Sequence, residues 1–215
     1  NALGIAGVCW NCKIMPVRVM ADSGVSNYSD IALGVKYAAD KGAHVINLSL
    51  GGYAYSNALR DAINYAVVEK NVVVVAGAGN DNVSTPFYPA AYDNVLAVAG
   101  TDSTDTKAAF SNYGTWVDIS APAVEIVTTY LGGDWGPANG TSLSTPCVAG
   151  VAALIRSQNP EWSAALVRNQ ILQTVDSLDA LNPAHAGRLG AGRINAAQAT
   201  QDPHPILVLA GTNVN

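Results

Sequence analysis

The sequence predicts an α/β fold of three layers, in which helices flank a mostly parallel sheet on both faces. Short β-branched runs bounded by Gly, Pro, Asn or Ser recur along the 215 residues, and segments of helical periodicity lie between the first three of them. Parallel strands need crossover connections, which helices usually provide, so this alternation indicates parallel pairing. No apolar run approaches the roughly 18 residues of a membrane span, so no membrane-spanning segment is expected.

Five runs are predicted as buried strands because they are short, rich in β-branched residues and closed by turn residues. They cover residues 14–20, 45–50, 72–76, 95–100 and 117–120.

Four segments are predicted as helices from their apolar spacing and their terminal residues. They cover residues 30–41, capped by Ser29 and ended by Gly42, residues 57–70, a segment that begins near 142–146 and runs to 157, and residues 163–175. The third is apolar on every face, so we expect it inside the protein with its N-terminus directed at a site.

Composition indicates one globular domain. Hydrophobic residues make up 49% of the chain and charged residues 13%, about half the usual share of roughly 25%, which excludes intrinsic disorder. Eleven Lys and Arg stand scattered against sixteen Asp and Glu, so no cationic surface is expected and nucleic acid is not a predicted partner.

One string is the first candidate for chemistry, Asn139-Gly140-Thr141-Ser142-Leu143-Ser144-Thr145-Pro146. A short turn delivers Ser142 to the start of the buried helix, where unpaired N–H groups and the helix dipole favour a developing negative charge. The alternative is that Ser142 and Thr145 only cap the helix.

Asn80 is the second candidate. It follows a valine-rich strand and the run Ala76-Gly77-Ala78-Gly79, at the carboxyl end of the sheet where open α/β folds bind ligands. Its amide can donate to an oxyanion. The alternative is a turn residue that tolerates a left-handed conformation.

Eight motifs in one order give the chain a resemblance to the subtilases, serine peptidases of the subtilisin kind, from Gly4 to about Thr200. They are Gly4-Ile5-Ala6-Gly7-Val8, Val45-Ile46-Asn47-Leu48-Ser49-Leu50-Gly51-Gly52, Ala76-Gly77-Ala78-Gly79-Asn80, Phe110-Ser111-Asn112-Tyr113-Gly114, Ile119-Ser120-Ala121-Pro122, Asn139-Gly140-Thr141-Ser142, Thr145-Pro146 with Val148-Ala149-Gly150, and Gly190-Ala191-Gly192-Arg193-Ile194-Asn195-Ala196-Ala197. The resemblance implies that residues 1–200 are the C-terminal portion of a subtilisin-like peptidase domain, with 201–215 a peripheral tail.

The same resemblance implies the roles of the site residues. Ser142 would be the nucleophile, and Asn80 with the backbone N–H of Ser142 would form the oxyanion hole. A polypeptide substrate would pair edge-to-edge with Ser49-Leu50-Gly51. The side chain before the scissile bond would enter a slot between that segment and the residues Ala76, Gly77, Ala78, Gly79 and Asn80, with Phe87 shortening the slot.

The family's catalytic Asp and His precede its serine, and neither motif is present in these 215 residues. His44, His185 and His204 are expected to be solvated or locally bonded, so no base is named. The full-length protein is therefore predicted to be a secreted serine endopeptidase and this chain alone to be inactive. The alternative is a pseudo-peptidase that binds peptides or has a structural role. A sedolisin-like acid peptidase is weaker, because Thr145-Pro146-Cys147-Val148-Ala149-Gly150 argues against it.

In subtilases the strand with the catalytic Asp lies inside the sheet, so the resemblance also implies a sheet that is incomplete at its N-terminal side. Unpaired backbone and exposed apolar surface should follow. We expect the segment from Gly4 to Met20 to be displaced or to pair with another copy of the chain, which makes self-association a further expectation.

The favoured interpretation of Cys9 and Cys12 is a local disulfide, followed by two unlinked thiols and then by a redox site. A zinc site is disfavoured because no second Cys/His pair has suitable spacing. Cys147 stands where the family usually has His, and is expected to be a packed thiol. Calcium is implied only by the family resemblance. The carboxylates lack the spacing of a dedicated loop, so no cofactor or metal ligand is assigned.

Overall fold

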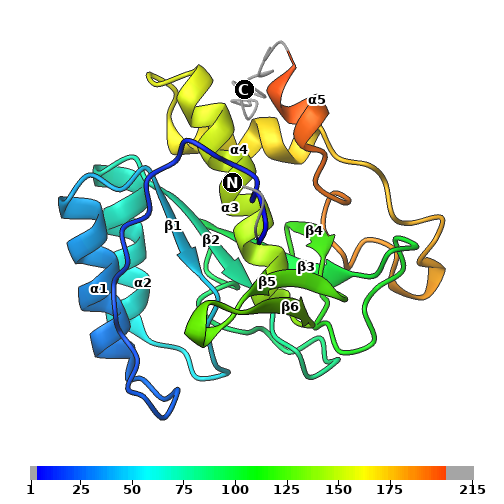
Figure 1. The fold of residues 1–215 in the computed structure, drawn as a ribbon, viewed down its shortest axis with the longest axis horizontal. Helices are drawn as coiled ribbons and strands as arrows, with labels where there is room; N and C mark the ends of the chain where they lie inside the picture. Colours follow the sequence, from blue (N-terminus) through cyan, green and yellow to red (C-terminus); the bar gives the residue numbers. More distant parts are fainter. Residues whose placement is uncertain (1–3, 202–215) are drawn as a thin grey trace, which may run out of the picture.

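A four-stranded parallel sheet lies between two layers of helices in the computed structural model, which describes residues 4–201 (Figure 1). The strands are β1 (Val45–Leu48), β2 (Val73–Gly77), β3 (Val95–Thr101) and β4 (Ile119–Pro122), in the order β1-β2-β3-β4. All three pairings are parallel. The predicted three-layer α/β fold is confirmed, and four of the five predicted strands form within two residues of their expected ends.

The helices divide between the two faces of the sheet. On one face lie α1 (Tyr28–Asp40), α2 (Asn57–Asn64) and the π-helix η1 (Tyr65–Glu69), and on the other lie α3 (Thr141–Gln158), α4 (Ala164–Gln173) and α5 (Ala196–Thr200). Side chains of β2 alternate between them: Val74 and Ala76 pack on the α1 and α2 side, Val73 and Val75 on the α3 and α4 side. This is why a valine run can be buried throughout.

Several helix ends differ from the prediction. The expected cap at Ser29 is wrong: the N-cap of α1 is Asn27, whose side chain makes no capping hydrogen bond. The predicted helix over 57–70 changes to a π-helix at Tyr65, a change that no feature of the sequence indicates. Ser163 caps α4 as its position suggests, since its hydroxyl accepts from the N–H of Leu166 at 3.2 Å.

An antiparallel hairpin, absent from the prediction, follows β4. Strands β5 (Ile126–Thr129) and β6 (Trp135–Ala138) pair across a short 3₁₀ turn, η2 (Leu131–Gly133). The sequence contains a pattern that predicts this hairpin, because a β-branched run is followed by Gly132-Gly133, and two adjacent glycines are typical of hairpin turns. A second 3₁₀ turn, η3 (Pro183–His185), lies before α5.

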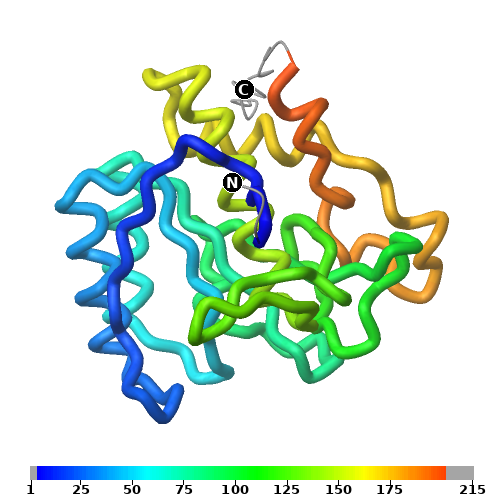
Figure 2. The backbone as a smooth tube through the Cα atoms, viewed as in Figure 1, coloured from blue at the N-terminus to red at the C-terminus, as the bar shows by residue number. Residues whose placement is uncertain are grey.

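The N-terminal segment shows the largest departure from the prediction. No strand forms over 14–20, so that prediction is wrong, and β1 pairs only with β2 among the described residues. The segment passes over α3, where Val8 contacts Gly150, and then runs alongside α1, where Val19 contacts Gly34 (Figure 2). It makes no strand pairing with the sheet among residues 4–201. Displacement of the segment and its pairing with a second copy of the chain both stay predictions.

Exposed apolar surface accompanies this arrangement, as expected. Ile14 is 85% exposed and Met15 41%. Within residues 4–201, no helix has both the length and the apolar character needed to cross a membrane.

Candidate active site

Ser142 lies in the first turn of α3, which begins at Thr141 after an N-cap at Gly140. Gly140 has φ of 147° and no side chain, so no side-chain cap is made there. The hydroxyl of Thr145 donates instead to the carbonyl of Thr141 at 2.7 Å. The capping alternative for Ser142 and Thr145 is therefore wrong. The Ser142 side chain is half-buried beside the N–H groups that open the helix.

Asn80 lies beside the same helix end because Thr141 holds its side chain. The backbone N–H and the hydroxyl of Thr141 both donate to Oδ1 of Asn80, at 2.9 and 3.1 Å. A backbone N–H can only donate, so the atom that it meets is the amide oxygen, and Nδ2 of Asn80 stays free to donate elsewhere.

The side-chain amide of Asn80 and the backbone nitrogen of Ser142 both lie near Gly140. A Cβ placed on Gly140 would lie 3.7 Å from Nδ2 and 3.9 Å from Oδ1 of Asn80, and 3.8 Å from the nitrogen of Ser142. Asn80 itself is not in the left-handed region, whereas Gly79, with φ of 99°, and Asn82, with φ of 54°, are. The left-handed turn alternative for Asn80 is therefore wrong.

The predicted substrate segment meets the helix through a hydrogen bond. Ser49 donates from Oγ to the carbonyl of Ser142 at 2.9 Å and accepts from the side chain of Asn47 at 3.0 Å. Leu50 is half-buried against the hydrophobic cluster on the α1 and α2 side of the sheet, and Gly51 is exposed. The structure thus brings the end of β1 next to the start of α3.

The end of β2 and the two residues that follow it pack against α3. Ala76, Gly77, Ala78 and Gly79 are all buried. A Cβ on Gly77 would lie 3.0 Å from Oγ1 of Thr145 and 3.2 Å from Oγ1 of Thr141, so a larger residue would require a small shift of the first turn of α3. The N–H of Gly79 donates to Oγ1 of Thr141 at 3.2 Å. These contacts fix the loop that carries Asn80.

Phe87 lies between the two segments that would form the slot. A Cβ on Gly51 would overlap Cε1 of Phe87, and one on Gly79 would lie 3.2 Å from its Cγ. Two backbone hydrogen bonds of 2.8 Å between Gly52 and Tyr88 hold the phenylalanine there.

Asn112 is a residue of the site to which the sequence analysis assigned no role, although it belongs to one of the recognised motifs. It is fully buried. Its Oδ1 accepts from the N–H groups of Asp81 at 2.9 Å and Val83 at 3.1 Å, and its Nδ2 donates to the carbonyl of Ala78 at 2.9 Å. Asn112 therefore braces the loop on both sides of Asn80.

The histidines that the structure describes lie elsewhere. His44 is exposed immediately before β1, at the amino end of the sheet, and His185 packs its ring against Tyr113 with 4.5 Å between ring centroids. Neither makes a hydrogen bond to Ser142. His204 and the predicted tail lie outside the described residues, apart from Gln201.

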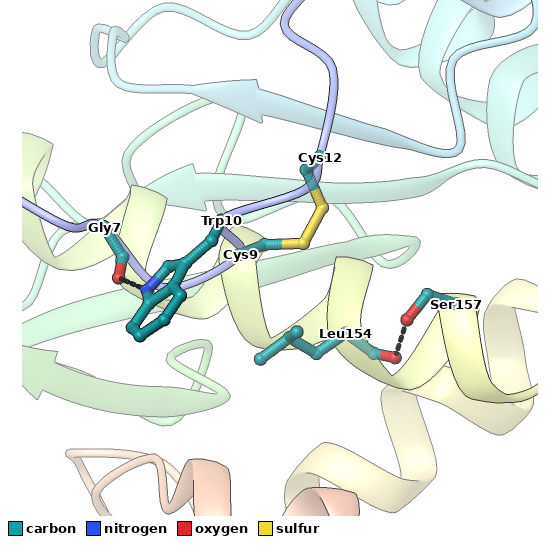
Figure 3. Close-up of a disulfide and its surroundings, with 6 residues drawn as sticks. All are labelled: Gly7, Cys9, Trp10, Cys12, Leu154 and Ser157. Carbon is teal, nitrogen blue, oxygen red and sulfur yellow. Dashed lines mark hydrogen bonds between the residues drawn. A yellow bond between two sulfur atoms is a disulfide. The ribbon is translucent and has the colours of Figure 1, made fainter. Parts of the chain in front are cut away.

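Cys9 and Cys12 form a disulfide, the reading favoured from the sequence. Figure 3 shows this loop beside α3, with Leu154 and Ser157 on the adjacent helix surface. Cys147 is a free, half-buried thiol that donates to the carbonyl of Leu143, and burial raises its pKa. This agrees with a packed cysteine.

No group of three or more His, Cys, Asp or Glu side chains among residues 4–201 could hold a metal ion. We therefore assign no calcium ligand among these residues.

Comparison with known proteins gives the family. A model of the subtilase family matches residues 1–192. Over 201 residues, 94% of the chain, it is 41% identical to an alkaline protease of Alkalihalobacillus alcalophilus and 44% identical to thermitase of Thermoactinomyces vulgaris, spanning 51% and 70% of those proteins. A solved protease from Pseudoalteromonas arctica matches 92% of the chain with a TM-score of 0.84 and 34% identity, over 65% of its own length. The chain belongs to the subtilase family.

Proposed function

We propose that Ser142 is the nucleophile of a serine endopeptidase and that Asn80 and the backbone N–H of Ser142 form its oxyanion hole. The observation that carries the proposal is the pair of hydrogen bonds from Thr141, which leave Nδ2 of Asn80 free beside Ser142. The hydroxyl oxygen of Ser142 would attack the peptide carbonyl, and both N–H donors would stabilise the oxyanion. A base supplied by sequence outside these residues would take the hydroxyl proton of Ser142 and pass it to the nitrogen of the leaving amine as the adduct collapses, which leaves an acyl-enzyme on Ser142 for water to hydrolyse.

The substrate proposed is an extended polypeptide beside Ser49, Leu50 and Gly51. The bond from Ser49 to the carbonyl of Ser142 supports this, because it sets the exposed end of β1 next to the nucleophile. Backbone pairing would provide affinity for the polypeptide, and the slot bounded by Ala76 to Asn80 would provide selectivity for the side chain before the scissile bond.

The chain of 215 residues is proposed to be inactive alone. A serine hydroxyl needs an adjacent base, and neither described histidine bonds to Ser142. The curated relatives exceed the matched region in length, which supports a base supplied by sequence outside these residues.

Labelling with a fluorophosphonate tests this proposal. The product of the complete reading frame should be labelled at Ser142 and should hydrolyse casein, whereas the 215-residue chain should do neither. Asn80→Ala in the complete protein should lower kcat with little change in KM, since removing such a donor from subtilisin costs about 10²–10³-fold. Stoichiometric labelling of Ser142 in the short chain would overturn the inactivity.

A pseudo-peptidase that binds peptides is the second candidate, favoured by the absence of a base beside Ser142 among residues 4–201. It predicts that the complete protein binds peptides and leaves Ser142 unlabelled.

Two further properties are proposed with the function. The Cys9–Cys12 disulfide supports a secreted protein, because disulfides persist in oxidising compartments. The edge of β1 and the exposed Ile14 support self-association of the short chain, which sedimentation at increasing concentration would detect.

A further inference from the structure

We propose that Phe87, Tyr53 and Asp81 close the slot beside Ser142, so that this chain accepts only glycine or alanine before the scissile bond. The inference rests on the proposed function, because it names the substrate class of the same site.

Phe87 forms the inner part of the closure. Its ring edge lies so close to Gly51 that a Cβ there would overlap Cε1, and its Cγ lies 3.2 Å from a Cβ placed on Gly79. Gly51 and Gly79 belong to the two segments that are proposed to form the walls of the slot, and Phe87 contacts both. The ring therefore fills the space between the walls, which a longer substrate side chain would need.

Tyr53 and Asp81 form the outer part. Tyr53 follows the wall that contains Gly51, and its ring packs edge-to-face on Phe87 with 5.1 Å between centroids and 75° between planes. Its hydroxyl donates to Oδ2 of Asp81 at 2.5 Å, and Asp81 directly follows Asn80 on the other wall. This hydrogen bond joins the two walls across the mouth of the slot.

Asn112, which holds the loop around Asn80, also contacts Tyr53. Nδ2 of Asn112 donates to the hydroxyl of Tyr53 at 3.3 Å, so the hydroxyl has one donor and one acceptor as partners. Burial and the Asp81 carboxylate raise the pKa of Tyr53, which keeps the hydroxyl protonated and able to donate at neutral pH.

A large substrate side chain would have to displace these groups together. It would break the Tyr53–Asp81 bond, separate the two rings and move Phe87 against the paired backbone of Gly52 and Tyr88. Glycine and alanine need none of these changes. Because burying an aromatic side chain removes its apolar surface from water, opening the slot should raise affinity for a phenylalanyl peptide by about 10-fold or more.

Fluorescence polarisation with the 215-residue chain tests the closure without requiring catalysis. The probes are fluorescein-labelled peptides Ala-Ala-Pro-X-Ala, with X as Gly, Ala, Leu or Phe. The wild-type chain should bind the Ala peptide at least about 10-fold more tightly than the Phe peptide. Phe87→Gly should raise affinity for the Phe peptide relative to that for the Ala peptide by about 10-fold. Equal affinity of the wild-type chain for both peptides would overturn the closure while leaving the proposed peptide groove intact.

Tyr53→Phe isolates the hydrogen bond to Asp81. It should raise affinity for the Leu and Phe peptides, whereas the matched control Tyr55→Phe should not, because the Tyr55 hydroxyl accepts from Arg60 and does not contact Asp81. Equal effects of the two variants would contradict a role for the bond.

Toluene binding, followed by NMR, separates the closure from the proposed function. Phe87→Gly, or Phe87→Ala if the glycine variant fails to fold by circular dichroism, should bind toluene in the vacated space, while the wild-type chain should not. If no peptide binds but toluene distinguishes the variants, the peptide groove fails and the filled slot stands. Toluene binding by the wild-type chain would show an open slot and overturn the inference.

Discussion

Ser49 donates a hydrogen bond from its side-chain hydroxyl to the backbone carbonyl of Ser142, at 2.9 Å, across 93 positions of sequence. The bond joins the end of β1, at the edge of the sheet, to the first turn of the helix that carries the proposed nucleophile. The carbonyl that accepts it belongs to the helix, so the bond sets where β1 ends relative to α3.

Ser49→Ala should therefore weaken the proposed peptide groove. Loss of one hydrogen bond should lower the free energy of unfolding by about 1 kcal/mol, measured by urea denaturation. Affinity for the alanyl peptide should fall as well, because the end of β1 is no longer tied to Ser142. Ser157→Ala is a suitable control, since the Ser157 hydroxyl donates to Leu154 within α3 and lies on the exposed side of the helix. Unchanged peptide affinity in Ser49→Ala would contradict the proposed role of the bond.

Asn112→Ala should be among the most destabilising single substitutions in the chain. It would leave the buried N–H groups of Asp81 and Val83 and the carbonyl of Ala78 without their partner. Each unsatisfied buried group costs about 1–3 kcal/mol, so the loss should exceed about 3 kcal/mol in urea denaturation.

Asn94→Ala is the matched control for Asn112→Ala, because the amide of Asn94 donates to the side chain of Asn64 at 2.8 Å and makes no bond to the Asn80 loop. Asn94→Ala should lower the free energy of unfolding by about 1 kcal/mol. Similar losses in the two variants would show that Asn112 does not brace the loop.

The sequence predicted the sheet well because its central strands are determined by local pattern. Valine runs such as 72–75 can be stable only where both faces are covered, and the glycines that follow allow α3 to pack closely. The places of Ser142 and Asn80 in the fold could also be predicted, since Ser142 lies in the first turn of α3 and Asn80 follows β2. Their catalytic roles stay a proposal. Their proximity depends on Thr141, whose two hydrogen bonds to Asn80 no local pattern could reveal.

The wrong predictions have a different physical origin. The run at 14–20 has the composition of a strand, but a strand also needs a partner, and the structure leaves β1 paired only with β2 among residues 4–201. Val19 packs on Gly34 of α1 instead. Asn112 was missed because a buried asparagine that braces a loop has no distinctive spacing in the sequence.

Stability should decrease in mild acid because of His185. Burial, with the positive charges of Lys107 and Arg188 nearby, lowers the pKa of His185 from its ordinary 6.5. The unfolded chain therefore binds more protons than the native chain as the pH falls through about 6.5. The contribution of His185 to the free energy of unfolding is therefore fully present above pH 6.5 and decreases as the pH falls below it. It stops changing once the pH is below the pKa of His185 in the native chain.

Thermal melts of His185→Gln between pH 7.5 and 5 test this dependence. Between these pH values the Tm of His185→Gln should fall less than the Tm of the wild-type chain. The Tm of His44→Gln, which removes an exposed histidine before β1, should fall as much as that of the wild-type chain. An unchanged decline in His185→Gln would assign the acid sensitivity to other groups.

Gly190 should tolerate alanine far less than Gly42, although both have φ near 80°, at 75° and 81°. Alanine in this region costs about 1–2 kcal/mol from its backbone conformation alone, and Gly42 has nothing within 4 Å of the added carbon. At Gly190 the same carbon would overlap the carbonyl group of Asp118. The segment after Gly190 runs along β4 through bonds from Ala191 to Asp118 at 2.8 Å and from Ile194 to Ser120 at 2.9 Å. Gly190→Ala must therefore strain or break this pairing. In urea denaturation it should lower the free energy of unfolding by about 2 kcal/mol more than Gly42→Ala does. Equal decreases in the two variants would mean that the segment moves away from β4 at little cost.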